Sequence, residues 1–363
     1  MSGHCASYDP YTTVRFVVIM FASSVSLVGI LTNITLIIGL VRLGLGLAQE
    51  RKRNTDYLYI TLVAVFDLFV CLSFSFIYGV DGLALYLKCP FLFEFFFKLA
   101  LPFYTLNRLA ELAIPYLYLV ATIEKWLVSC AGRSVQSLAG VVSSNRIRIT
   151  AGASTILMTA LIKLPTALAY AVTEYGNCSD EYGRLQLEPT ALANQSLYKF
   201  VDFYMANLLG TFLPFTALLG LNCAILRRIN LHSLLSRSAA NSLHLTSVLL
   251  RIKPPSGYTR DRERVEQCRE DARLTMVSIA VLVSGYLLCM TPNFVLTVLE
   301  QFYESLLNQA KAFYLGSSDT ISVLSMLHSC ASMPMLYTCN LERLPAAIRK
   351  KELVLKYMYS MFE

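Results

Sequence analysis

Paired charges interrupt the apolar sequence of this chain at two places. The stretch YLVATIEKWLVSC sets Glu124 and Lys125 side by side, next to Trp126, the only tryptophan. Arg108 and Glu111 are three residues apart, so on a helix they share one face and can neutralise each other. An acid beside a base can hold its partner in place or attract a ligand of opposite charge. Both pairs are therefore candidates for function.

A single acid, Asp67, stands in the stretch LVAVFDLFV. Charge is costly at bilayer depth, which makes any ionisable group there a functional candidate. Simpler roles remain open for each group. Asp67 can be a protonated acid bonded to a neighbouring helix, Lys125 can anchor a helix end at the lipid surface, and Arg108 with Glu111 can be a purely structural pair.

The composition places these charges in a membrane protein. Of 363 residues 55% are hydrophobic and 15% charged, and the mean hydropathy is +0.53. A spanning helix needs about 20 mostly apolar residues. Seven stretches qualify, and they predict an all-α membrane protein with a seven-transmembrane helix bundle: 16–41, 57–80, 99–123, 151–172, 203–226, 274–299 and 312–341.

Lys and Arg residues gather in the first, third and fifth connections and in the tail, which predicts that the N-terminus is extracellular and the C-terminus cytoplasmic. This asymmetry accounts for the net charge of +7 without a nucleic-acid partner. The expected units are an outer segment (1–14), the bundle (15–341) and a short amphipathic cytoplasmic helix with the tail (342–363), lying on the lipid bilayer. The mixed-charge stretch YTRDRERVEQCREDARLT is expected to extend the sixth helix into the cytoplasm.

Enzymatic and transport functions have less support. No His-Glu-x-x-His or Gly-x-Ser-x-Gly motif occurs, and four scattered histidines predict no metal site or cofactor. A transporter relay through Asp67, Arg108, Glu111 and Lys163 is an open alternative, although the chain lacks the inverted repeat of most transporters.

Prolines fall within the last four expected spans, where each removes a backbone hydrogen bond and favours a kink: Pro165, Pro214, Pro292 and Pro334. With these prolines in place, the chain resembles the rhodopsin-like G-protein-coupled receptors along almost its whole length. The residues that match the family's activation and G-protein-coupling motifs are Asn33, Asp67, Glu124, Lys125, Trp126, Pro214, Cys289, Met290, Pro292, Met333, Pro334 and Tyr337.

The resemblance implies a mechanism and a disulfide. In the family the acid corresponding to Glu124 restrains its basic neighbour at rest, and the freed base helps to receive a heterotrimeric G protein. A bridge between Cys89 and Cys178 is expected by the same resemblance. The chain departs from the family where Lys125 replaces an arginine, which has a planar fork that an ammonium lacks, and where Met290 and Met333 replace a tryptophan and an asparagine.

The stretches around the third and fifth spans are similar to the invertebrate FMRFamide and myosuppressin receptors. This implies a plasma-membrane receptor for an amidated neuropeptide, with a carboxylate for the peptide's arginine and an apolar slot for its aromatic ring. A chemosensory receptor for a small molecule is the alternative. The expected ligand-binding residues are Tyr104, Arg108, Glu111, Asp202, Tyr204, Phe294, Glu300 and Asp319.

The largest outer loop, 173–199, contains two sequons, at Asn177 and Asn194. Both lie on the side that the glycosylation machinery reaches if the predicted orientation holds.

Overall fold

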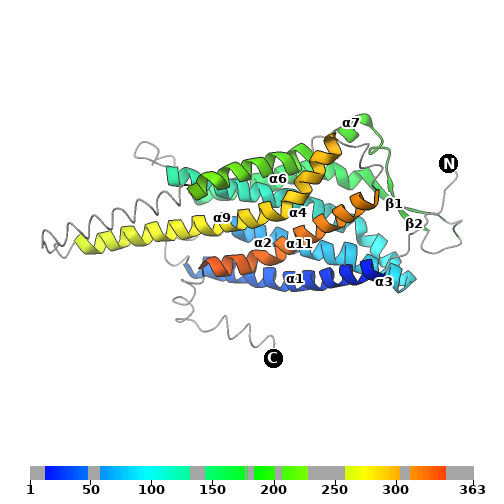
Figure 1. Cartoon of the computed structure of the whole chain (residues 1–363), viewed down its shortest axis with the longest axis horizontal. Coiled ribbons are helices and arrows are strands. Elements are labelled where there is room, and N and C mark those ends of the chain that lie inside the picture. The colour runs from blue at the N-terminus through cyan, green and yellow to red at the C-terminus, as the bar shows by residue number, and fades with distance from the viewer. Residues whose placement is uncertain are drawn as a thin grey trace, which may run out of the picture.

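The computed structural model describes residues 13–47, 58–130, 144–175, 178, 184–200, 207–227, 258–302 and 311–340. The predicted amphipathic helix after residue 341 lies outside these residues. The described chain is dominated by long helices, which run side by side as one bundle (Figure 1). They are α1 (Thr13–Leu47), α2 (Leu58–Phe74), α4 (Pro90–Cys130), α6 (Asn145–Ala169), the helix Leu208–Arg227, α9 (Tyr258–Phe302) and α11 (Lys311–Asn340).

In the part of the chain that the structure describes, five helical segments are long and apolar enough to cross a membrane: Thr13–Arg42, Leu58–Tyr86, Asn145–Ala169, Leu208–Arg227 and Met276–Leu299. The all-α membrane class predicted from composition is thus supported. The two other segments expected to span, within α4 and α11, are helical and belong to the same bundle, but each contains more polar sequence.

One apolar core joins most of the helices. Its buried members come from α1, α2, α4, the helix Leu208–Arg227, α9 and α11, with Leu117, Leu218 and Val283 completely buried. On the outside of the bundle, α1 and α6 expose many large apolar side chains, including Phe21 and Leu161. Lipid rather than water suits such surfaces.

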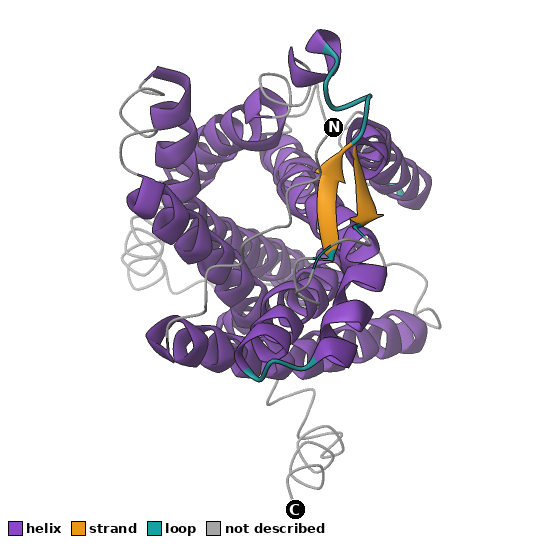
Figure 2. Ribbon diagram, turned by 90° about the vertical axis from the view of Figure 1, so that its right-hand side faces the viewer, coloured by secondary structure: helices purple, strands orange, loops and turns teal. Residues whose placement is uncertain are grey.

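The two ends of the bundle differ. At one end lies an antiparallel hairpin of β1 (Tyr170–Glu174) and β2 (Leu185–Pro189), which contacts α4 and lies across one side of the bundle in Figure 2. The short helix α3 (Asp81–Tyr86) lies at the same end, and α7 (Ser196–Phe200) follows the hairpin. At the opposite end α9 extends past the other helices, as the mixed-charge stretch predicted (Figure 1).

Two features of the hairpin end depart from the sequence prediction. The fourth expected span, 151–172, was predicted to end three residues too late, because α6 ends at Ala169 and Tyr170 already belongs to β1. The segment 173–199, predicted as the largest outer loop, forms most of a hairpin that was not predicted. Tyr175 continues the strand pairing by donating its backbone N–H to the Arg184 carbonyl at 2.8 Å.

Within the described residues, two π-helical turns occur that were not predicted from the sequence: η1 (Ser75–Val80), after α2, and η4 (Leu208–Phe212). A π turn leaves backbone carbonyls without their usual helical partners. Within η4 one backbone carbonyl is bonded from α4, where the Tyr116 hydroxyl donates to the Leu209 carbonyl at 2.8 Å. In η1, Tyr78 is directed toward α11, where its hydroxyl donates to the Ser322 Oγ at 2.8 Å.

Candidate functional site

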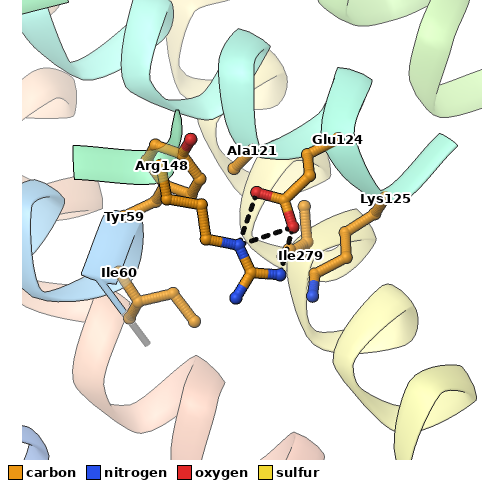
Figure 3. A pocket seen from close by; sticks show the side chains of 7 residues that line it. All are labelled: Tyr59, Ile60, Ala121, Glu124, Lys125, Arg148 and Ile279. Atoms are coloured by element: carbon orange, nitrogen blue, oxygen red, sulfur yellow. Dashed lines mark hydrogen bonds and ion pairs between the residues drawn. The ribbon is translucent and has the colours of Figure 1, made fainter. Parts of the chain in front are cut away.

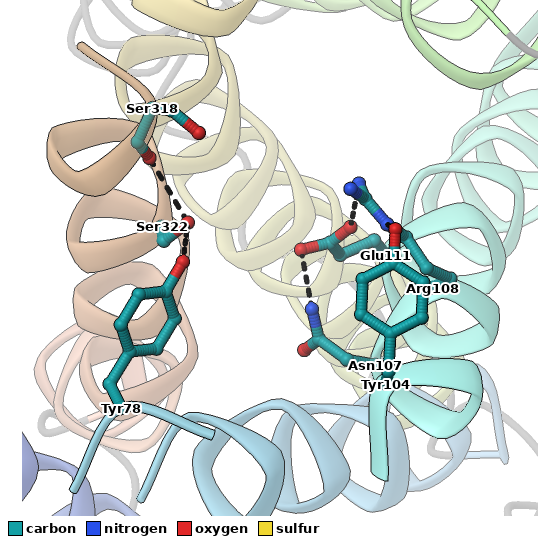
Figure 4. Close-up of polar contacts among 7 residues, drawn as sticks. All are labelled: Tyr78, Tyr104, Asn107, Arg108, Glu111, Ser318 and Ser322. Atoms are coloured by element: carbon teal, nitrogen blue, oxygen red, sulfur yellow. Dashed lines mark hydrogen bonds and ion pairs between the residues drawn. The ribbon is translucent and has the colours of Figure 1, made fainter. Parts of the chain in front are cut away.

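A cluster of polar side chains lies on one face of α4, in its half nearer the hairpin. Arg108 Nη1 donates to Glu111 Oε2 at 3.3 Å, and Asn107 Nδ2 donates to Glu111 Oε1 at 2.8 Å (Figure 4). Tyr104 accepts a hydrogen bond from Arg108 Nε at 3.2 Å, and the guanidinium lies 5.1 Å from its ring centroid. The predicted pairing of Arg108 with Glu111 is therefore confirmed.

This hairpin-side cluster, defined as Tyr104, Asn107, Arg108 and Glu111, remains open on one side. The side chains of Arg108 and Glu111 are 46% and 31% exposed. On the opposite side of the view in Figure 4, Tyr78 of η1 is bonded to Ser322 of α11. The site thus combines a carboxylate, a guanidinium and aromatic rings, which can bind a charged and partly aromatic ligand.

The other residues expected to bind a ligand do not all join this cluster. Asp319 forms an ion pair with Arg15 of α1 at 3.1 Å. Phe294 stacks on Phe215, with ring centroids 4.5 Å apart, so its ring contributes to the packing of α9 on the helix Leu208–Arg227. Glu300 lies in α9, but its side chain is not among those that the structure describes. Asp202 and Tyr204 lie outside the described residues.

A second polar group lies in the middle of the bundle around Asp67, which is completely buried. Its two carboxylate oxygens each accept a hydrogen bond at 2.8 Å, one from Ser329 and one from Ser332 of α11. Asn33 of α1 donates to the backbone carbonyl of Ser329 at 3.0 Å. Asp67 of α2 and Asn33 of α1, both predicted as functional residues, thus bond to the same segment of α11. The two serines were not anticipated.

A third group, at the end of α4 away from the hairpin, contains the acid of the Glu-Lys pair. Arg148, in the first turn of α6, donates through Nε to both oxygens of Glu124, at 2.9 and 3.0 Å, and through Nη2 to Oε1 (Figure 3). Their side chains are only 7% and 4% exposed. The two charges are therefore a buried, multiply hydrogen-bonded pair between α4 and α6.

In this arrangement Glu124 has a basic partner, Arg148, other than the neighbouring Lys125 that the family resemblance implied. The carboxylate is engaged by Arg148, while Lys125 lines the same small pocket beside the pair (Figure 3). Tyr59 of α2 and Ile279 of α9 also line it, so four helices meet there. A planar guanidinium can reach both carboxylate oxygens at once, which an ammonium cannot. Arg148 was not predicted as a functional residue, because in the sequence it was used only as one of the basic residues that indicate the cytoplasmic side.

The remaining motif residues lie on α4, the helix Leu208–Arg227, α9 and α11. Met290 packs against the main core, and Cys289 is a free thiol. Trp126 and Met333 are half-buried, whereas Pro292 and Pro334 are exposed within continuous helices. Tyr337 belongs to α11, but its side chain lies outside the description.

The predicted disulfide between Cys89 and Cys178 is wrong. Cys89 is a free cysteine at the start of α4, whereas Cys178, between the two strands, is disulfide-bonded to another residue. Asn194 is exposed in a turn and thus open to modification, while Asn177 lies outside the described residues.

Comparison with protein-family models and with curated proteins finds no match for this chain. Its function must therefore be argued from the three polar groups.

Proposed function

We propose that this chain is a plasma-membrane receptor that crosses the bilayer seven times, binds an amidated neuropeptide outside and signals inside through a heterotrimeric G protein. One observation carries this proposal. A single helix, α4, holds the hairpin-side cluster in one half and Glu124 near its other end. The thirteen residues from Glu111 to Glu124 correspond to about 20 Å of helix.

The hairpin-side cluster supports a ligand that carries both a cation and an aromatic ring. Glu111 offers a carboxylate to a peptide guanidinium, a pairing strengthened by its two-point geometry. Tyr104 supplies an aromatic face, and it contacts Tyr170 at the start of the hairpin edge-on, with centroids 6.3 Å apart. A ligand here would therefore touch both the bundle and the hairpin.

The pair formed by Glu124 and Arg148 supports regulation at the opposite end. A ligand shifts a conformational equilibrium only by its differential affinity for the two states. In the state described, the buried pair holds α4 to α6 beside α9. A ligand that favours separation of these helices would expose the charges to a cytoplasmic partner.

A second candidate is a receptor for a small neutral molecule. It is favoured by one feature, because both oxygens of Glu111 already accept hydrogen bonds, from Asn107 and Arg108. A peptide cation must displace Arg108 from the carboxylate or share it, whereas a neutral ligand need not.

Screening amidated peptides and small odorants on cells that express the chain tests both versions, with a second-messenger response as the readout. A response to peptides ending in Arg-Phe-amide, lost when the G protein is inactivated, supports the proposal. A response to neutral molecules alone would favour the second candidate. Solute uptake that persists without any G protein would overturn both and indicate a transporter.

A further inference from the structure

Three sulfur atoms meet in the bundle, outside the polar groups described above. Cys71 of α2 places its Sγ 3.8 Å from the Sγ of Cys330 in α11, and Met326, one turn earlier in α11, places its Sδ 3.4 Å from the same Cys330 Sγ. Cys71 and Met326 are completely buried, and both cysteines are free. We call these three residues the sulfur cluster.

Gly29 of α1 packs directly against the sulfur cluster. A Cβ at Gly29 would lie 2.2 Å from the Cys330 Sγ and 2.9 Å from the Cys71 Sγ. Any side chain at this position would therefore collide with the sulfurs. The absence of a Cβ lets α1 approach both sulfur atoms closely and hold them together.

The surroundings of the cluster favour sulfur as the only ligand type. Both oxygens of the neighbouring carboxylate, Asp67, are taken by serine hydroxyls. The Asn33 amide nitrogen lies 3.9 Å from the Cys71 Sγ and is a donor, not a metal ligand. Among the described residues no group of three or more His, Cys, Asp or Glu side chains could hold a metal ion, so a site here needs the Met326 thioether beside the two cysteines.

We propose that the sulfur cluster binds a soft monovalent metal cation, Cu(I), between α2 and α11. Thiolate and thioether ligands together select Cu(I) over hard cations. Metal–sulfur bonds of about 2.3 Å in a trigonal site hold the sulfur atoms about 4 Å apart. The two separations from Cys330 Sγ, 3.8 Å to Cys71 and 3.4 Å to Met326, are close to that spacing.

Charge balance also fits the site. One thiol loses its proton to solvent as its sulfur forms the bond to Cu(I), so that one thiolate, one thiol and one thioether surround a single positive charge. The resulting complex is neutral. A neutral complex avoids the cost of a net charge inside the bilayer. The bound ion would link α11 to α2 close to Asp67.

The test uses the purified full-length chain in detergent, with ascorbate to keep copper reduced and bicinchoninate as the competing chelator. We expect the wild type to retain one Cu(I) against a concentration of chelator that strips isolated thiols. X-ray absorption at the copper edge should report three sulfur neighbours. Nitrogen or oxygen neighbours at that copper would overturn the proposal.

Variants assign the copper to the cluster. Met326→Leu keeps the apolar volume, so the variant should fold. Its Cu(I) affinity should fall about tenfold or more, because even the loss of a residue that only supports a metal ligand has an effect of that size. Cys330→Ser should abolish retention. Cys223→Ser, which changes an exposed thiol on another helix, is the matched control and should bind as the wild type does. Equal retention by Met326→Leu and the wild type would refute a three-sulfur site.

Discussion

The buried pair of Glu124 and Arg148 gives the sharpest prediction about stability. Replacing Arg148 with Met leaves the carboxylate buried without its partner. Breaking one side of such a pair costs about 3–5 kcal/mol of unfolding free energy, and the exposures of 7% and 4% place this pair in the buried class. A loss of 3 kcal/mol lowers the ratio of folded to unfolded chain more than a hundredfold.

The variants are purified in detergent and their unfolding is followed by size-exclusion chromatography after heating. Arg148→Met should lower the midpoint by several degrees. Arg146→Met is the matched control, because Arg146 is on the same turn of α6 but exposed, and its loss should change the midpoint little.

A double-mutant cycle then separates the pair from its parts. Glu124→Gln alone should destabilise the chain, and the combination of Glu124→Gln with Arg148→Met should cost less than the sum of the two, by about 0.5–3 kcal/mol. Strict additivity of the two changes, or equal effects of Arg146→Met and Arg148→Met, would refute the interaction.

Three further predictions concern other parts of the bundle. Glu111→Gln should lower the binding affinity for peptides with a cationic C-terminal arginine about tenfold to a hundredfold, the effect of losing one or two charge-assisted hydrogen bonds. Neutral analogues should lose less affinity in the same competition-binding assay. Equal losses for both would exclude this carboxylate as the arginine's partner. Cys89→Ser should leave the disulfide of Cys178 intact, which non-reducing peptide mapping would show, and its disappearance would contradict the free thiol. Gly29→Ala should destabilise the chain by about 1–3 kcal/mol because its Cβ meets Cys330 Sγ, whereas Gly39→Ala, with no atom within 4 Å of the new Cβ, should be neutral or stabilising in the same thermal assay.

Much of the bundle could be predicted from the sequence because long apolar stretches leave the backbone few alternatives to a helix in lipid. The extension of α9 followed from its alternating charges. The pairing of Arg108 with Glu111 followed from a spacing of three residues, which fixes their geometry within a single helix.

The rest depends on contacts between helices, which local sequence does not determine. Arg148 is 24 residues from Glu124 and reaches it only because α4 and α6 pack together. Lys125 was closer in sequence, yet adjacent residues on a helix point in different directions. The hairpin was missed because β1 directly follows an apolar helix, and Tyr170 extends that apolar stretch without a break.

The proposed receptor function depends most directly on α4 crossing the membrane, with the hairpin-side cluster outside and Glu124 inside. Two cysteine variants test this orientation. Glu94→Cys lies near the hairpin end of α4, where Glu94 is 58% exposed, and Arg146→Cys lies at an exposed position of α6. Each variant is treated with a membrane-impermeant maleimide and its labelling is compared with that of the wild type. We predict added labelling of Glu94→Cys on intact cells and of Arg146→Cys only after permeabilisation. Labelling of both positions from the same side would contradict the proposed receptor.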